Sequence, residues 1–217
     1  MAHSQFRDSA SQAALAWFIG GGLMLVSVVA TALSPSPFFS YGSLSMVLFA
    51  AALLVFAFGV RGQGSVTARR PLGTITLVLL AVWTVLGSVL SGAIADSLSN
   101  DSLPGPLMAF AYADSFVQFA LALICVMQIA RLGVVPAPWN WLPAWIVGAV
   151  SLIWLLLQLV GSGVSYGPDL VTWVLMSGDG LARVGGTMLL GVLAIVLADR
   201  ATRRTTTDVP LVPETLR

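Results

Sequence analysis

Runs of about 20 apolar residues recur along the whole chain, with short polar breaks between them. A helix needs about 20 predominantly apolar residues to cross a hydrocarbon core of about 30 Å. We place these runs at residues 13–33, 42–60, 74–96, 106–130, 141–160 and 178–198. The pattern predicts an all-α fold, a polytopic transmembrane helical bundle with six spans.

The amino-acid composition supports one membrane domain with short tails. Of the 217 residues, 58% are hydrophobic and only 9% are charged, whereas a soluble domain typically has about 25% charged residues. We expect a cytoplasmic N-terminal tail at 1–12, the six-span domain at 13–200 and a cytoplasmic tail at 201–217. The second tail is rich in threonine and contains Pro210 and Pro213, so we expect it to be disordered.

Arginine marks alternate breaks between the apolar runs. It precedes the first run and follows the second, fourth and sixth runs, at Arg7, Arg61, Arg69, Arg70, Arg131, Arg200, Arg203 and Arg204. The other three breaks have no arginine and contain Asp96, Asp101 and Asp169. Because basic residues are enriched in cytoplasmic loops, this asymmetry predicts that both termini lie inside.

The expected location is the plasma (cytoplasmic) membrane, crossed several times. All ten basic residues are arginine, which we interpret as the codon usage of a high-GC bacterial genome. An alternative concerns the first run, because Ala30-Thr31-Ala32 has the small-x-small form of a signal-peptidase site. Cleavage there would remove residues 1–32 and leave five spans. The long apolar run, and Asp8 beside Arg7, argue against it.

The sequence has no motif for catalysis, metal binding or a cofactor. Cys125 is the single cysteine, and His3, the single histidine, lies in the N-terminal tail. These counts exclude a disulfide within the chain and an intramembrane bis-histidine haem site. Since no nucleophile is paired with a base and no nucleotide loop occurs, we expect a non-enzymatic protein without cofactors, and no nucleic-acid partner.

Two charged residues interrupt the apolar runs, Asp114 in the fourth and Arg183 in the sixth. Each lies 17 residues before a break arginine, Arg131 or Arg200, so each is expected about 25 Å above the inner boundary. Charges inside a membrane are costly and need a partner or water. We therefore predict a polar site in the outer leaflet, bounded by the last four spans. Its candidate residues are Asp114, Arg183, Asp179, Gln118 and Gln158, with Ser88 and Ser91 near the same height.

Three interpretations of Asp114 and Arg183 stand. The first is a structural ion pair that joins the fourth and sixth spans. In the second, Arg183 holds an anionic group while Asp114 takes part in proton or cation coupling. In the third, the arginine reaches the outer headgroups by itself, and the shared depth is a coincidence.

Residues 169–178 precede the sixth run and form an apolar segment too short to span. We expect Ser177-Gly178-Asp179-Gly180 to break this segment from the sixth span. The segment is either an interfacial helix on the outer leaflet or an extension that makes the sixth span long and tilted.

Small residues that let helices approach closely occur in three places: Gly20-Gly21-Gly22, Ser88 with Gly92, and Gly185-Gly186 with Gly191. We interpret them as packing positions. None resembles a phosphate-binding loop, because no lysine follows.

Two classes of function remain. The default is a structural or accessory membrane protein that binds lipid, another membrane protein or a second copy of itself. The alternative is a small secondary transporter or channel that uses the pocket at Asp114 and Arg183. A polar route to both surfaces would favour transport, whereas a sealed site would favour the accessory role.

Overall fold

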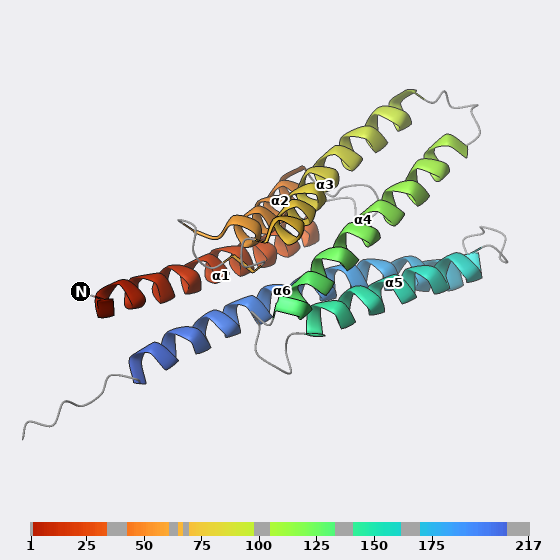
Figure 1. The fold of residues 1–217 in the computed structure, drawn as a ribbon. Helices are drawn as coiled ribbons and strands as arrows, with labels where there is room; N and C mark the ends of the chain where they lie inside the picture. Colours follow the sequence, from red (N-terminus) through yellow and green to blue (C-terminus); the bar gives the residue numbers. More distant parts are fainter. Residues whose placement is uncertain are drawn as a thin grey trace, which may run out of the picture.

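The computed structural model describes residues 2–33, 43–60, 65–66, 70–97, 105–132, 141–161 and 170–207. This part of the chain forms six helices and no β-strand (Figure 1). The helices are α1 (Ala2–Ala32), α2 (Ser43–Phe58), α3 (Pro71–Ser97), α4 (Gly105–Leu132), α5 (Leu142–Gly161) and α6 (Leu170–Thr207). The predicted all-α fold is thus confirmed, with one helix for each apolar run.

Among the described residues, three segments are long and apolar enough to cross a membrane: Gln12–Ala32 in α1, Pro71–Ser97 in α3 and Ala109–Leu132 in α4. Shorter apolar helical stretches occur at Leu44–Phe58 and Leu142–Leu156. A membrane location is compatible with these helices, whose exposed side chains include many large hydrophobic ones.

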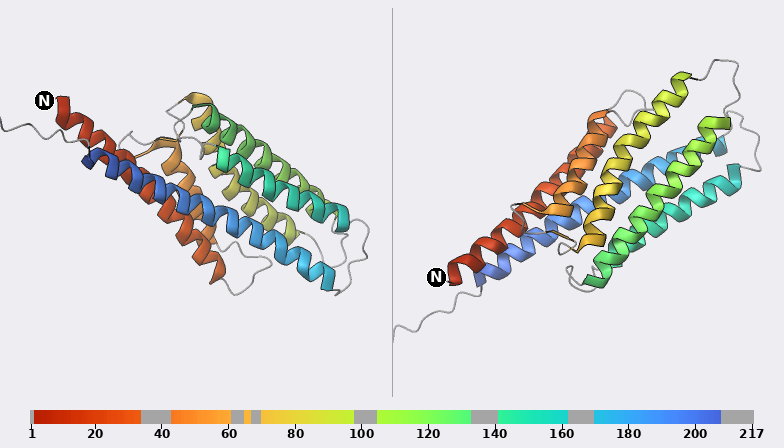
Figure 2. Two further views of the ribbon diagram at one scale, coloured as in Figure 1. Left: turned by 90° about the horizontal axis from the view of Figure 1, so that it is seen from below. Right: turned by 45° about the horizontal axis from the view of Figure 1, so that its top comes forward.

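The helices follow one another as neighbours and close into a ring. Each described helix packs against the next one along the chain, and α6 returns to pack along α1. No other pair of described helices is in contact. Figure 2 shows α1 and α6 side by side, with α3, α4 and α5 on the opposite part of the bundle. The ring therefore closes through two helices that are separated in the sequence by 137 residues, from the end of α1 at Ala32 to the start of α6 at Leu170.

Most of the hydrophobic core lies towards one end of the bundle, which we call the arginine end. Arg70, Arg131, Arg200 and Arg203 mark it, and all four side chains are exposed. Nearby core residues include Ala57, Leu77, Cys125, Ile129 and Leu197, which come from four different helices. Towards the opposite end the packing is sparser: between residues 105 and 124 of α4, no described side chain is buried.

Hydroxyl groups join α1 to α2. Ser45 donates to the main-chain oxygen of Ser27 over 3.0 Å and shares a second hydrogen bond with Thr31. Both serines are buried. Because hydrogen bonds to the backbone satisfy their hydroxyls, these polar side chains add a specific helix–helix contact without an orphaned polar group.

The end of α2 is closed by a glycine and by the chain that follows. Gly59 has a φ of 69° and donates to the oxygen of Val55 over 2.8 Å, as in a left-handed helix cap. Val66 then donates to the oxygen of Phe56, and the Ser65 hydroxyl to that of Ala57. The last carbonyls of α2 thus find donors within the core.

Part of the predicted glycine packing is confirmed. A Cβ on Gly20 would lie 2.7 Å from the Phe56 ring, and one on Gly21 would lie 2.7 Å from the main-chain oxygen of Gly191. A Cβ on Gly186 would meet Ile146 of α5 at 3.0 Å. Gly22, Gly92 and Gly185 have open space where a Cβ would stand, so the prediction is wrong for these three.

The sixth helix decides between two alternatives at its start and differs from expectation at its end. It runs without interruption from Leu170 through the Ser177–Gly180 stretch, so the predicted break is not formed. Of the two alternatives for the short segment, the structure shows the extension of a long helix. At the other end α6 continues to Thr207, and residues 201–207 are helical where we expected disorder; residues 208–217 lie outside the described ones. Hydrogen bonds from Thr202 to the oxygens of Ala198 and Asp199 accompany this last turn.

Candidate polar site between α3 and α4

Asp114 lies at the contact between α3 and α4, with its side chain partly exposed. The indole Nε1 of Trp83 donates to its Oδ1 over 2.8 Å, and the amide Nε2 of Gln118 donates to its Oδ2 over 2.9 Å. Gln118 stands one turn further along α4, so helical periodicity places it beside Asp114. Trp83 comes from α3, and its bond ties the two helices together.

Gly87 makes room for this carboxylate. It is buried, and a Cβ built on it would lie 2.6 Å from Oδ1 of Asp114. It stands four residues after Trp83, so both positions share one face of α3. We refer to Trp83, Gly87, Asp114 and Gln118 as the Asp114 site.

In the Asp114 site, the carboxyl group of Asp114 accepts hydrogen bonds from neutral donors. Both hydrogen bonds that the structure gives Asp114 come from uncharged side chains. An ion pair between exposed side chains joins Arg203 to Asp199 over 2.8 Å, far along α6. Trp83 and Gln118 therefore stabilise the carboxyl group of Asp114 through hydrogen bonds from neutral donors.

The structure does not bring Asp114 and Arg183 together. Within the described helices α4 packs against α3 and α5, but not against α6, which carries Arg183. The expected ion pair between the fourth and sixth helices is thus not formed, because α5 lies between them in the ring. Arg183 is partly exposed, and its main-chain oxygen accepts a hydrogen bond from Thr187 at 2.9 Å.

Of the other residues predicted for the polar site, the structure describes the side chains of some but not of others. Gln118 joins Asp114 as predicted. The side chains of Asp179 and Gln158 lie outside the described ones, so their place in a polar site stays a prediction. Ser91 donates to the oxygen of Ser88 within α3 at 2.8 Å, which satisfies its hydroxyl locally.

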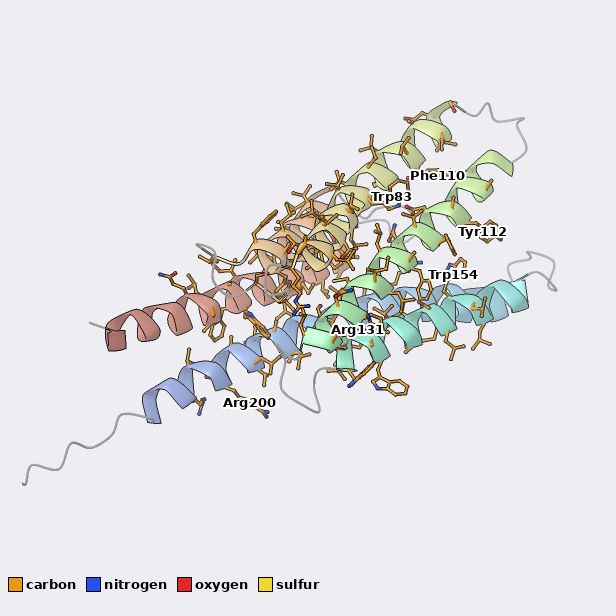
Figure 3. The ribbon with its side chains drawn as sticks, in the orientation of Figure 1. Trp83, Phe110, Tyr112, Arg131, Trp154 and Arg200 are labelled. Atoms are coloured by element: carbon orange, nitrogen blue, oxygen red, sulfur yellow. The ribbon has the colours of Figure 1, made fainter. Side chains whose placement is uncertain are left out.

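Aromatic residues flank the site on both sides of α4 (Figure 3). Trp83 and Phe110 lie on the side of α3, whereas Tyr112 and Trp154 lie on the side of α5. The rings of Tyr112 and Trp154 meet edge to face, with centroids 6.4 Å apart. Such a pair contributes about 0.5–1.5 kcal/mol to stability beyond the effect of its buried area. This ring contact joins α4 to α5.

Trp83 and Gly87 were not among the residues predicted for the site. A signal for Gly87 is present in the hairpin that α3 and α4 form. It stands ten residues before the end of α3 at Ser97, and Asp114 stands nine after the start of α4 at Gly105. Similar distances from a connecting loop place two residues at a similar height in an antiparallel pair, and Trp83 lies one turn away from Gly87.

The described residues contain no cluster of three or more histidine, cysteine, aspartate or glutamate side chains that could hold a metal ion. The chain matches no protein-family model, no curated protein and no solved structure in the comparisons made.

Proposed function

We propose that this chain is an integral protein of the bacterial plasma membrane with six spans, both termini in the cytoplasm, and a non-enzymatic accessory role. In this role it binds lipid, another membrane protein or a second copy of itself. Six helices, one for each apolar run, support the number of spans. The exposed arginines at one end of the bundle support the orientation, because basic residues are retained on the cytoplasmic side.

The packing of α1 supports its retention in the mature protein. Gly20 contacts α2 through Phe56, and Gly21 contacts α6 through Gly191. Cleavage after Ala32 would remove both contacts and leave the ring open. The uncleaved, six-span form is therefore the one we propose.

The apolar core at the arginine end is the observation that carries the accessory role. Its members are hydrophobic side chains from α1, α2, α3, α4 and α6, together with Val66. The four described polar side chains that are buried, Ser27, Ser45, Ser65 and Thr76, each donate to a main-chain oxygen. A core of this kind favours a sealed end over a polar route through the bundle.

Transport is the second candidate, and the Asp114 site is the observation that favours it. A carboxyl group inside an apolar helix is typical of ion and proton pathways. However, the helix break that a transport site would use is not formed at Ser177–Gly180, since α6 is continuous there. The accessory role therefore ranks first.

A flux assay separates these two functions. The purified full-length protein would be placed in lipid vesicles carrying a pH-sensitive dye, with proton, sodium or potassium gradients applied in turn. The accessory role predicts leak rates equal to those of protein-free vesicles. Gradient dissipation by the parent that is lost in Asp114→Asn would overturn the accessory role and establish transport.

Cysteine labelling tests the topology. In a Cys125→Ser parent, single cysteines at Ser36, Ser99 and Ser165 should react with a membrane-impermeant maleimide in intact spheroplasts. Single cysteines at Gln63 and Ala137 should react only after permeabilisation. Labelling of the second group in intact spheroplasts, or protection of the first, would contradict six spans with both ends inside.

A further inference from the structure

The Asp114 site has a property that an ion pair would not have. Its two partners, Trp83 and Gln118, are neutral and occupy different oxygens of the carboxyl group. An indole is a donor only, whereas a carboxamide carries both donors and an acceptor. The two partners therefore respond differently when the carboxyl group gains a proton.

In the ionised state both oxygens accept, as the structure shows, from Trp83 at 2.8 Å and Gln118 at 2.9 Å. When a proton binds at Oδ2, that oxygen becomes a donor and the Nε2 group of Gln118 no longer suits it. A half-turn of the amide exchanges its nitrogen and oxygen, so Oε1 then accepts from the new hydroxyl. Oδ1 keeps the hydrogen bond from Trp83 in both states.

Within the described residues of α3, α4 and α5, the charged side chains lie away from Asp114. Two helices pack against α4, namely α3 and α5. Asp96, exposed at the far end of α3, is the one ionisable residue on that helix, and the described side chains of α5 include none. On α4 itself, Tyr112 faces α5, Cys125 lies three turns away and Arg131 lies at the arginine end.

The close approach of Gly87 on one side of Asp114, and the neutral donors on its two oxygens, suit a proton as the ligand. On the α3 side, Oδ1 of Asp114 lies close to the backbone of Gly87, because a Cβ built on Gly87 would lie only 2.6 Å from this oxygen. A metal ion would need several oxygen ligands, and no cluster of acidic, histidine or cysteine side chains among the described residues supplies them. A proton requires only the carboxyl group and an acceptor for its hydrogen bond.

We propose that Asp114 is a reversible proton-binding site in the α3–α4 contact, with the Gln118 amide as the partner that serves both the ionised and the protonated state. The inference goes beyond the accessory role and does not depend on it. Proton binding at equilibrium requires no gradient and no flux, so its failure and the failure of the proposed function are separate results.

Infrared spectroscopy of the full-length protein in lipid vesicles tests this directly, because a protonated carboxyl group has a carbonyl band that a carboxylate lacks. Spectra would be recorded over the pH range in which circular dichroism shows unchanged helix content. We expect a carbonyl band in the parent at low pH that disappears as the pH rises. Because the chain has nine aspartate and glutamate residues, the band of Asp114 is the part of the parent spectrum that is missing in Asp114→Asn. It should be retained in Asp96→Asn, which removes an exposed carboxyl group from α3.

A second variant keeps the test decisive if Asp114→Asn does not fold. Trp83→Phe retains Asp114 but removes the hydrogen bond to Oδ1, so the carbonyl band should remain titratable and shift to higher frequency. A band that stays constant across the pH range, or that never appears, would show that Asp114 keeps one protonation state, and the proposal would be wrong. A band unaffected by Trp83→Phe would place the titrating group elsewhere and would also overturn it.

Discussion

At the scale of single residues, the contact between Gly87 and Asp114 decides how closely α3 and α4 approach. A methyl group at Gly87 would lie 2.6 Å from Oδ1. We expect Gly87→Ala to lower the free energy of unfolding by about 1–3 kcal/mol, because overpacking forces neighbouring groups apart. Thermal unfolding in micelles, followed by circular dichroism, measures the effect.

Gly92→Ala is the matched control on the same helix. No atom lies within 4 Å of a Cβ at that position, and replacing a helical glycine by alanine generally stabilises by about 0.5–1 kcal/mol. The two substitutions should therefore change stability in opposite directions. Equal effects would mean that Gly87 has no special role at the α3–α4 contact.

The hydrogen bond from Trp83 gives a second prediction at this scale. Trp83→Phe removes the donor to Asp114 and should lower the free energy of unfolding by about 1.5–3 kcal/mol, as expected for a hydrogen bond to a charged group. Trp154→Phe is the control, since the contact given for Trp154 is its edge contact with Tyr112. A loss of stability in Trp154→Phe as large as that in Trp83→Phe would contradict the importance of this hydrogen bond.

Sequence patterns located Asp114 and its neighbour Gln118 but not the group across the helix contact. Helical periodicity relates residues on one helix, so it correctly paired these two. Equal depth in the membrane suggested Arg183 as the partner, but depth gives no information about which helices are adjacent. That information depends on the order of helices around the ring, in which α5 separates α4 from α6.

At the scale of helices, α1 and α6 cross where two glycines meet. A Cβ on Gly21 would lie 2.7 Å from the oxygen of Gly191, and one on Gly191 would lie 3.1 Å from the oxygen of Gly21. Close approach of backbones at small residues is a usual way for membrane helices to associate. Because the obstructing atoms belong to the backbone, they cannot move aside as a side chain would.

Gly21→Ala should therefore separate α1 from α6 and lower the free energy of unfolding by about 1–3 kcal/mol. Gly22→Ala, one position along the same helix, has nothing within 4 Å of the new Cβ and should have little effect. Size-exclusion chromatography after a series of heating steps would compare the two variants with the parent. The prediction is wrong if Gly22→Ala is the less stable of the two.

The helices themselves were largely predictable, since each apolar run of the sequence contains one. The ends of α6 were not. The Ser177–Gly180 stretch contains two glycines, which weaken a helix by about 1 kcal/mol each, yet the long helix continues through it. Local propensity is a weak prior, and the apolar residues on both sides of this stretch favour one continuous helix.

At the scale of the whole molecule, contacts between the two halves of the chain hold the ring together. One half contains α1, α2 and α3, and the other contains α4, α5 and α6; they meet where α3 packs against α4 and where α1 packs against α6. We expect the full-length chain, cut at a protease site inserted between residues 98 and 104, to remain associated in micelles. Affinity purification through a tag on one half, with detection of the other, measures this.

Substitution of the crossing glycines adds a control to that experiment. Gly21→Leu should reduce recovery of the second half after cleavage, whereas Gly22→Leu should leave it unchanged. Separation of the two halves in the cut parent protein would show that the connecting segment, rather than the helix contacts, holds the ring together.

Closure of the ring by α1 and α6 also has a consequence for biosynthesis. Translation makes α1 before α6, so the surface around Gly21 receives its partner only when Gly191 has been made. Until then α1 through α5 can form only an open chain of neighbouring pairs. Completion of the fold is therefore coupled to completion of translation, and a nascent chain that stalls before α6 leaves the Gly21 surface without its partner.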